Sequence, residues 1–425
     1  MIRETRSIQT QLAIVGTGLG GLAAGIFAKY RGIKSAQVGH TGAITYTTGY
    51  FDLLGGLLGE QILDPWQGLS SLKKHYPKHP LVRIAKEDIH KALNLFNKEL
   101  NNMGIGYSEP GNTNLMALLP SGVCKPTISV PLTMLAGVKA KEAKSPTLLI
   151  DFVGLQGFSA VEFVANLKKS WPLLTAQRIA FPDMIEGQQV FPEVMARALE
   201  VPSTRQKLAE TIKPFIGNAK YLGLPSILGI NKPDLIHNNM EELLGVKVFE
   251  IPSIPPSVPG MRLRELFEQK FVDKNVTLIP QHKVEHIELN DDGAKLFFKD
   301  PFGDIEISCK ATILASGRFL SGGLKAEQQN IVETLLNIPV TQPTGRDDWY
   351  QEKYFDPKGH NINQVGVEID NNFRPLNTKG EPINRRLFAA GTIIAHQDWV
   401  RQRCGAGVSL STAYQAVKYA AKVLD

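Results

Sequence analysis

The chain has 425 residues, of which 43% are hydrophobic and 21% charged, and its formal net charge at pH 7 is +6. A single hydrophobic core rarely grows beyond about 250–300 residues, so this length predicts a globular protein of more than one domain. The positive excess is small, and the sequence contains no run of lysines and arginines of the kind that binds along a nucleic acid. We therefore expect no nucleic-acid partner.

The cysteines exclude two classes of protein. The chain contains only Cys124, Cys309 and Cys404, far apart and without a C-x-x-C motif. Three such residues cannot hold an iron–sulfur cluster through the usual four cysteines, and they do not form a secreted disulfide framework. The pattern favours a reducing, cytoplasmic location.

Residues 12–27 are apolar and follow Arg3 and Arg6, an arrangement similar to a signal peptide. A glycine pattern within this stretch explains it better. No other apolar run reaches about 18 residues, so we expect no transmembrane helix. Any membrane contact would then be peripheral or made through a partner.

The strongest local signal lies in residues 11–32. Residues 12–15 suit a buried parallel strand, apolar residues continue at helical spacing to residue 30, and a second strand is expected at 36–38. Between the first strand and the helix the glycines follow the order G-x-G-x-x-G. They permit a tight turn, leave room for a phosphate and let the helix pack closely. The residues predicted to cradle a phosphate at the helix N-terminus are Gly16, Gly18, Gly20 and Gly21. The alternative is a glycine-rich turn that binds nothing.

One residue expected of a dinucleotide site is missing. An Asp or Glu about 20 residues after the motif usually binds the adenosine ribose. Here residues 37–41 read Gln-Val-Gly-His-Thr, without a carboxylate. The pattern favours a shorter flavin such as FMN, or FAD held in an unusual way.

Residues 41–56 form a loop rich in Gly, Thr and Tyr that offers hydroxyl and backbone N–H groups, and Thr48 and Gly49 are its candidate flavin contacts. An ordinary turn is the alternative. Residues 63–80 contain His75 and His79 without a nearby third metal ligand. We expect a solvated basic surface segment there and no metal site.

The middle of the chain alternates predicted helices and strands. Helices are expected at 87–103, 159–167, 193–199, 204–216 and 234–244, and strands within 114–138, at 148–152 and at 221–229. This pattern predicts an inserted α/β domain. We expect residues 1–75 and 256–425 to form the flavin-binding domain and residues 76–255 the inserted substrate or cap domain.

A proline-rich stretch, 252–259, precedes a helix predicted at 261–273, with Arg262 and Arg264 in its first turn. Cations at a helix N-terminus oppose the helix dipole, which points to a bound anion nearby. An exposed arginine pair is the alternative. Strands are then expected at 276–279, 283–289, 294–299, 304–308 and 312–314.

Two later strands also end in glycine. The strand at 312–314 leads to a tight turn, a strand at 386–390 leads to a second one, and an alanine-rich helix at 403–424 opens with glycines. The N-terminus of this helix could face the electron-accepting end of a flavin. The further cofactor contacts predicted here are Ser316, Gly317, Gly391, Thr392, Gly405 and Gly407.

The order GTGLGG, ATILASG and LFAAGT resembles the flavoproteins with two dinucleotide-binding domains. That resemblance implies an α/β fold, a Rossmann-like flavin-binding domain of the FAD/NAD(P)-binding type with an inserted second α/β domain. More closely, the chain resembles the family of B subunits of anaerobic glycerol-3-phosphate dehydrogenase. The segments that carry this are TTGYFDLLGG, PPSVPGMRLRELFEQKFV, ATILASGRFLSGGL, TGRDDWY and RCGAGV.

The resemblance implies FMN as cofactor, with FAD as the alternative, and a heterodimer with a catalytic A subunit, joined by a membrane-bound iron–sulfur C subunit. The complex would oxidise sn-glycerol 3-phosphate to dihydroxyacetone phosphate and pass electrons to quinone. The chain would be cytoplasmic and peripheral on the inner face of the membrane.

Two features depart from the wider superfamily: Thr392 replaces a usual acidic residue, and residues 397–402 are unusually bulky and polar. For hydride transfer from a secondary alcohol, His396 is the candidate base, with a surface histidine as the alternative. The candidate phosphate ligands are Arg262, Arg318 and Arg401. Rival hypotheses are a fumarate-reductase-like or ketosteroid-dehydrogenase-like enzyme and a non-catalytic electron-relay protein.

Overall fold

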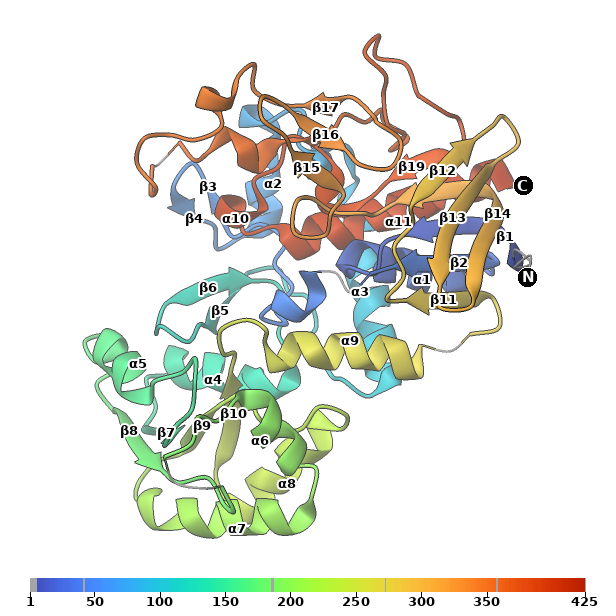
Figure 1. Cartoon of the computed structure of the whole chain (residues 1–425). Helices are drawn as coiled ribbons and strands as arrows, with labels where there is room; N and C mark the ends of the chain where they lie inside the picture. The colour runs from blue at the N-terminus through green and yellow to red at the C-terminus, as the bar shows by residue number, and fades with distance from the viewer. Residues whose placement is uncertain (1–5, 41–42, 185–186, 272, 357, 425) are drawn as a thin grey trace. The chain divides into compact units, whose positions relative to one another are not determined.

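The computed structural model describes residues 6–40, 43–184, 187–271, 273–356 and 358–424 (Figure 1). The chain forms two compact units. The first unit comprises Met1–Ala43, Asp52–Phe96 and Phe271–Asp425, and the second comprises Ile44–Phe51 and Asn97–Lys270. Each unit has its own sheet and its own helices, so each is an α/β structure.

A seven-stranded sheet organises the first unit, in the order β11-β2-β1-β14-β13-β12 with β19 also paired to β14. Its strands are β1 (Arg6–Val15), β2 (Ser35–Gly39), β11 (Val276–Pro280), β12 (His286–Leu289), β13 (Ala294–Asp300), β14 (Gly303–Leu314) and β19 (Leu387–Ala389). The pairings β11–β2, β2–β1, β1–β14 and β14–β19 are parallel. Those of β12, β13 and β14 are antiparallel.

The register of the parallel strands brings distant parts of the sequence together. Val15 lies opposite both Val38 and Leu314, and Leu314 lies opposite Ala389. The carboxyl ends of β1, β2, β14 and β19 therefore meet at one edge of the sheet. In open α/β sheets this edge is where ligands bind.

The helix α1 (Leu19–Tyr30) packs against α11 (Gly405–Leu424) beside this sheet (Figure 1). Residues 20–28 of α1 are all buried. The rings of Phe27 and Tyr414 join the two helices edge to face, with centroids 5.3 Å apart. This contact anchors the N-terminal and C-terminal thirds of the chain to each other.

Short elements complete the first unit. They are β3 (Gly56–Leu57), β4 (Glu60–Gln61), α2 (Pro65–His75), η2 (Pro80–Arg83), β15 (Leu324–Ala326), β16 (Ile331–Glu333), β17 (Val340–Thr341), η4 (Arg346–Asp348), η5 (Asn361–Gln364), β18 (Gly366–Val367), η6 (Gly391–Ile393) and α10 (Trp399–Gln402). The helix α3 (Lys86–Met103) begins in the first unit and ends in the second.

The prediction of a solvated basic surface segment at residues 63–80 is wrong for most of that stretch. Residues 65–75 form the helix α2, because Asp64 accepts hydrogen bonds from two first-turn N–H groups and Pro65 suits the first helical position. Trp66 and Leu72 of this helix are buried. His75 is exposed as predicted, whereas His79 has no exposed surface.

Three predicted boundaries also differ. The strands expected at 304–308 and 312–314 are one strand, β14. The stretch 114–138 forms the hairpin β5 (Leu115–Leu118) and β6 (Cys124–Thr127) but ends in a helix, α4 (Leu132–Glu142). The helix after the proline-rich stretch, α9 (Val258–Lys270), starts three residues early, so Arg262 and Arg264 lie in its second turn and not in its first.

A four-stranded parallel sheet, β10-β9-β7-β8, organises the second unit. The strands are β7 (Thr147–Phe152), β8 (Leu174–Ile179), β9 (Tyr221–Pro225) and β10 (Lys247–Ile251). The helices, besides α4 and α9, are η1 (Ala43–Tyr46), α5 (Ala160–Leu167), α6 (Pro192–Ala198), α7 (Pro202–Ile212), η3 (Lys213–Phe215) and α8 (Pro233–Leu244). η1 begins one residue before the unit boundary.

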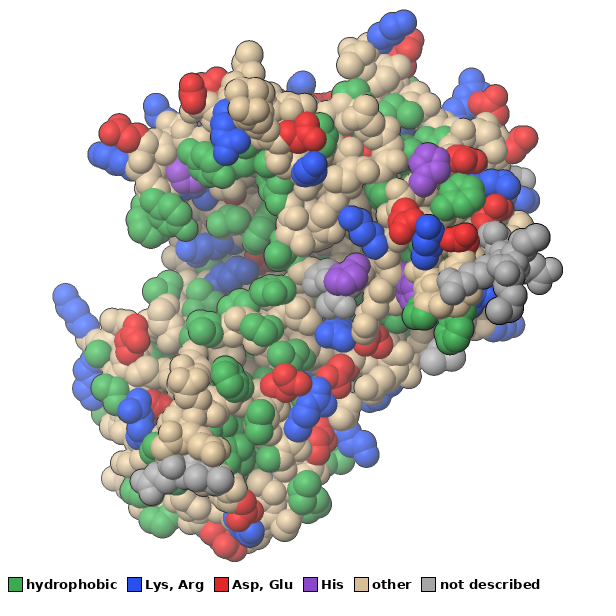
Figure 2. Space-filling model, viewed as in Figure 1, with side chains coloured by type: hydrophobic (Ala, Val, Ile, Leu, Met, Phe, Trp, Pro, Cys, Tyr) green, Lys and Arg blue, Asp and Glu red, His purple; other side chains and the backbone are tan. Residues whose placement is uncertain are grey.

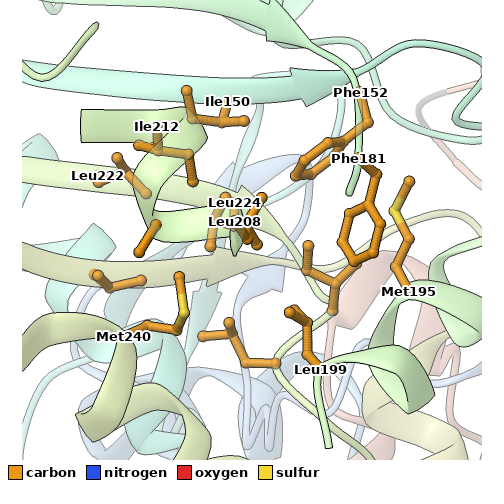
Figure 3. Packing of buried hydrophobic residues seen from close by; sticks show 14 of the residues in the cluster. Ile150, Phe152, Phe181, Met195, Leu199, Leu208, Ile212, Leu222, Leu224 and Met240 are labelled. Atoms are coloured by element: carbon orange, nitrogen blue, oxygen red, sulfur yellow. The ribbon is translucent and has the colours of Figure 1, made fainter. Parts of the chain in front are cut away.

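Both faces of this sheet are buried, as expected of a parallel sheet. On one face Ile150 and Leu222 pack with Leu208, Ile212 and Met240 from α7 and α8 (Figure 3). On the other face a separate cluster gathers Leu149, Phe163, Trp171, Leu174 and Phe249. Alternate residues of β7 thus enter two different cores.

Three further observations concern membrane spans, metal sites and the charge of the surface. In the part of the chain that the structure describes, no helix combines the length and apolar character needed to cross a bilayer. The same described residues contain no cluster of three or more His, Cys, Asp or Glu side chains placed to hold a metal ion. Figure 2 shows lysines and arginines interspersed with acidic side chains on the face in view.

Candidate functional site

Two of the motif glycines are required by close backbone packing at the end of β1. Gly16 has φ +119°, and a Cβ there would lie 2.3 Å from the carbonyl oxygen of Ala315. A Cβ on Gly21 would lie 2.0 Å from the carbonyl oxygen of Gly16. These positions exclude any side chain, so they fix the turn between β1 and α1 and the approach of β14.

Gly18 and Gly20 have a different environment. A Cβ on Gly18 would meet no atom within 4 Å, and Gly18 is the N-cap of α1 without a side-chain cap. The atom nearest to a Cβ built on Gly20 would be the Cα of Gly391, at 3.4 Å. The first turn of α1 contains no acidic residue, and its N–H groups lack partners within the helix. Open space beside a free helix N-terminus suits the phosphate of a flavin.

The ends of β14 and β19 add polar groups at the same edge of the sheet. Ser316 follows β14, and its Oγ is buried without a hydrogen-bond partner among the described residues. Gly317 has φ +68°, and Gly391, after β19, donates its N–H to Thr412 Oγ1 at 2.7 Å. An unpaired buried hydroxyl is costly. A polar ligand atom at Ser316 would satisfy it, so the residues present fit a flavin.

The end of β2 is closed by contacts within the protein. Gln37 donates from Nε2 to the carbonyl oxygen of Gly16 at 2.8 Å, and Thr17 donates from Oγ1 to that of His40 at 2.8 Å. A Cβ on Gly39 would lie 2.5 Å from the backbone nitrogen of Thr17. Residues 35–40 supply no carboxylate, and Thr41 lies outside the described residues.

Arg318 binds the loop after β19 and not an external phosphate. Its guanidinium donates to the carbonyl oxygens of Thr392 at 2.7 Å, Gln397 at 3.0 Å and Ile394 at 3.4 Å, and also to that of Asn363. Burial lowers the pKa of Arg318 to about 10. Every guanidinium nitrogen is engaged by backbone, so Arg318 fixes the loop that carries Thr392 and His396.

His396 and Arg401 both lie between β19 and α11. His396 has φ +65°, donates its backbone N–H to the carbonyl oxygen of Gln364 at 2.9 Å, and bonds through Nε2 to Glu368 Oε2. Arg401 is one-third exposed, and its Nε lies 4.0 Å from Asp398 Oδ2. Asp398 also caps α10.

The N-terminus of α11 is occupied by the protein itself. Asp52 accepts from the N–H of Ala406 through Oδ1 at 3.0 Å and from the N–H of Gly407 through its carbonyl oxygen at 2.6 Å. A Cβ on Gly407 would lie 2.8 Å from Leu53 Cα, whereas one on Gly405 would meet Trp399 at an ordinary 3.6 Å. The close approach predicted at Gly407 is therefore to the backbone of residues 52–53.

Thr48 and Gly49 belong to the second unit. Gly49 has φ +78°, and its carbonyl oxygen accepts from Tyr107 Oη at 2.8 Å. Thr48 Oγ1 accepts from the N–H of Tyr50 at 3.4 Å. These contacts show a turn stabilised within the second unit.

Arg262 lies deep in the second unit. It is 3% exposed and donates to the carbonyl oxygen of Gly229 at 2.8 Å and to both carboxylate oxygens of Glu250 at 2.6 and 2.8 Å. Burial favours the neutral form of Glu250, but the Arg262 charge and hydrogen bonds hold its pKa below the ordinary value.

A small pocket, with little room beyond a single water molecule, borders Arg262, Tyr107, Thr133 and Asp234. Glu250 balances the charge of Arg262, and Asp234 adds a carboxyl group whose pKa burial raises. The described contacts therefore give this pocket no excess positive charge for a phosphate.

Three residues in these networks had no sequence signal. Glu368 is 28 positions from its partner His396. Asp52 caps a helix 354 positions later, and the buried His79 lies 3.9 Å from Cys404 Sγ, 325 positions away. Spacing rules act over a few residues, so only the folded chain reveals these pairs.

Comparisons with known proteins identify the family to which this chain is similar. The model of the FAD binding domain family matches residues 11–408. The B subunit of anaerobic glycerol-3-phosphate dehydrogenase from Aliivibrio fischeri (strain ATCC 700601 / ES114) is 26% identical over 435 residues, covering 95% of this chain and 94% of that protein. The protein of the same name from Yersinia pestis bv. Antiqua (strain Antiqua) is 29% identical over 414 residues, covering 94% of this chain and 95% of that protein.

Among solved structures, 3-ketosteroid delta1-dehydrogenase from Sterolibacterium denitrificans is 11% identical with a TM-score of 0.43, covering 97% of this chain and 100% of that one. The resemblance to the B-subunit family predicted from the sequence is confirmed by the sequence relatives, and the predicted flavin-binding α/β class by the family model. Because that model spans nearly the whole chain, this protein belongs to the FAD binding domain family and is a flavin-dependent oxidoreductase.

Proposed function

We propose that this chain is the B subunit of an anaerobic glycerol-3-phosphate dehydrogenase, which oxidises sn-glycerol 3-phosphate to dihydroxyacetone phosphate. The observation that carries the proposal is end-to-end similarity to proteins of that name, at 26% and 29% identity over about 95% of this chain and of theirs. The open space at the N-terminus of α1 and the unpaired Ser316 hydroxyl, both in the first unit, support it.

The proposed partners are a catalytic A subunit and a membrane-bound iron–sulfur C subunit, with quinone as the final acceptor. The chain contains three cysteines, fewer than the four of a usual cluster, which supports clusters held by a partner. The proposed location is cytoplasmic, on the inner face of the membrane and attached through these partners.

We propose FMN as the flavin. The open space at Gly18 and the N-terminus of α1 would hold its phosphate, and the unpaired Ser316 hydroxyl would contact a polar atom of the ligand. The chemistry supplied by a flavin bound there would be acceptance of a hydride from the alcohol carbon. The end of β2 through His40 lacks the carboxylate that binds an adenosine ribose, which favours FMN over FAD.

Among the chain's own residues, His396 is the proposed acceptor of the substrate hydroxyl proton and Arg401 the proposed phosphate ligand. Gly391 and Thr392 belong to the loop that Arg318 fixes, which would hold these groups in place. Arg262 is better assigned to the fold of the second unit, since Glu250 neutralises it.

The test is reduction of the purified, flavin-loaded chain, alone and together with the A and C subunits. Loss of the oxidised flavin absorbance on adding sn-glycerol 3-phosphate supports the proposal. Bleaching only in the presence of the A subunit would favour the electron-relay role. Oxidation of a steroid or a dicarboxylate in place of glycerol 3-phosphate would overturn the proposal.

The flavin itself is identified by denaturing the protein and separating the released cofactor by chromatography. Release of FMN supports the assignment made from the end of β2. Release of FAD would show that the adenosine is held without a carboxylate from residues 35–40.

The phosphate cradle has a matched pair of variants. We expect Gly18→Val to weaken flavin binding at least about 10-fold, because its side chain fills the space beside the α1 N-terminus. Gly345→Val is the control, since a Cβ there also meets nothing within 4 Å. Equal flavin affinity in both variants, measured by fluorescence titration, would place the phosphate elsewhere.

A further inference from the structure

His396 and Glu368 are neighbours across two chain segments of the first unit. Val367 bridges Ile394 in parallel, and Ala395 donates its N–H to the carbonyl oxygen of Val367 at 3.0 Å. This pairing brings Glu368, one residue after Val367, close to His396, two residues after Ile394. Their side chains bond through His396 Nε2 and Glu368 Oε2.

The backbone holds His396 in an unusual conformation. Its φ of +65° is disfavoured for a residue with a Cβ and is found mostly where surrounding contacts impose it. Here the contacts are the bond from its N–H to Gln364 at 2.9 Å and the clamp of Arg318 on the carbonyl oxygens of Ile394 and Gln397. Such over-determined strain is typical of functional positions.

Glu368 is itself held from two further directions. Arg83 approaches Oε1 through a terminal nitrogen at 3.5 Å, and Thr341 donates from Oγ1 to Oε2 at 3.5 Å. Arg83 is anchored in turn by the carbonyl oxygen of Ile369 at 3.1 Å. Burial would raise the pKa of Glu368, but the bond to His396 and the charges of His396, Lys78 and Arg83 lower it below its ordinary value. The carboxylate is therefore ionised at neutral pH.

An ionised carboxylate has no proton to donate, so the bond requires the proton to sit on His396 Nε2. In the neutral form of this imidazole the lone pair is on Nδ1, which has no hydrogen-bond partner within the described residues. The side chains of His396 and Glu368 are 23% and 25% exposed, so neither is sealed from solvent.

We propose that Glu368 is a positioning residue that holds His396 in the Nε2-protonated tautomer, so that Nδ1 takes the hydroxyl proton of the alcohol substrate. This inference rests on the proposed function. The alcohol loses one hydride, which the bound flavin accepts, and one proton, which goes to Nδ1, so atoms and charges balance. Charged or titratable groups near the pair are Arg83, Lys78 and His79.

The test compares Glu368→Gln with Glu288→Gln in the flavin-loaded complex. Glu288 is a matched control, because its Oε1 lies 3.6 Å from His286 Nε2 in an exposed His–Glu pair of the same unit. We expect Glu368→Gln to lower kcat at least about 10-fold with little change in KM. Glu288→Gln should change neither.

A second readout does not depend on activity. Nitrogen-15 spectra of histidine-labelled chain, with His396→Asn identifying the signals, should show a protonated Nε2 and an unprotonated Nδ1. Glu368→Gln should give a mixture of tautomers while keeping the wild-type thermal stability and flavin content.

Two results would overturn the inference: a wild-type His396 protonated on Nδ1, or an active wild-type complex whose kcat is unchanged by Glu368→Gln. A wild-type complex that does not oxidise glycerol 3-phosphate would instead overturn the proposed function, and the proton-transfer role with it.

Discussion

At the scale of single residues, the buried ion pair of the second unit shows how a polar group can serve the fold alone. Arg262 and Glu250 are 3% and 1% exposed and share two hydrogen bonds. Such a pair stabilises little over apolar residues of the same shape, yet removing one partner leaves an uncompensated buried charge.

We expect Glu250→Gln to lower the free energy of unfolding by about 3–5 kcal/mol, because it leaves the buried Arg262 charge without its counter-charge. Urea unfolding followed by circular dichroism measures this. Glu193→Gln, which breaks an exposed pair with Arg197, should cost less than about 1 kcal/mol. Equal effects of the two substitutions would contradict the assignment.

His79 makes a second residue-scale prediction. Burial lowers its pKa to about 3, so the folded chain keeps it neutral while the unfolded chain protonates it near its ordinary pKa of 6.5. Between these values the unfolded state binds more protons, and stability therefore falls as the pH falls. The loss is up to about 1.4 kcal/mol per pH unit.

The variant His79→Asn isolates this effect. His79 caps η2 by accepting from the N–H of Leu81 at 3.2 Å, and Asn can make the same cap without titrating. Unfolding free energies measured between pH 4 and pH 7, roughly the window of the shift, should depend less steeply on pH in His79→Asn than in wild type. The exposed His75→Asn should leave the slope unchanged, and a wild-type slope in both would refute the account.

At the scale of elements, α11 depends on how closely its first turn approaches residues 52–53. Asp52 accepts two hydrogen bonds from the first turn of α11, one through its side chain and one through its backbone carbonyl oxygen, and so caps this helix. The second bond requires a close approach of the two backbones, which Gly407 allows. The same argument separates the two glycines that open this helix.

We expect Gly407→Ala to destabilise the chain by about 1–3 kcal/mol, since the added Cβ would lie 2.8 Å from Leu53 Cα. Gly405→Ala should be neutral within about 0.5 kcal/mol, because its Cβ meets Trp399 at an ordinary 3.6 Å. Thermal unfolding of both variants without flavin is the measurement. A Gly407→Ala variant as stable as Gly405→Ala would mean that the approach of residues 52–53 is looser.

At the scale of the whole molecule, the proposed phosphate cradle belongs to one unit. The cradle, Ser316 and the loop after β19 all lie in the first unit. A ligand that binds only the native state raises the free energy of unfolding by mass action, by about 2.7 kcal/mol at a ligand concentration of 100 Kd.

Flavin at saturating concentration should therefore raise the melting temperature of the apo chain. On flavin binding, backbone hydrogen exchange should slow most at the first turn of α1 and at residues 315–318. These are the segments proposed to hydrogen-bond the flavin, through the N–H groups of α1 and the hydroxyl of Ser316. Gly18→Val should lose the shift and Gly345→Val should keep it. Protection confined to the second unit would contradict a cradle at α1.

The sequence by itself determined the elements whose causes are local. The turn between β1 and α1, the second strand at 35–39 and the glycine-opened C-terminal helix follow from apolar runs and glycine spacing within about 20 residues. The family resemblance also rests on short segments of contiguous sequence, such as RCGAGV at the start of the C-terminal helix. For these features neighbouring residues supply the constraint, and a pattern along the chain therefore records it.

Only the tertiary structure decided which polar groups are free to act. Arg262 and Arg318 read as phosphate ligands until Glu250 and the carbonyl oxygens after β19 engage them, and His79 reads as a surface residue until the fold buries it. Glu368 reaches His396 only because residues 367 and 394 pair. The reason is physical: burial and hydrogen bonding depend on partners distant in sequence, and the spacing of residues along the chain does not encode them.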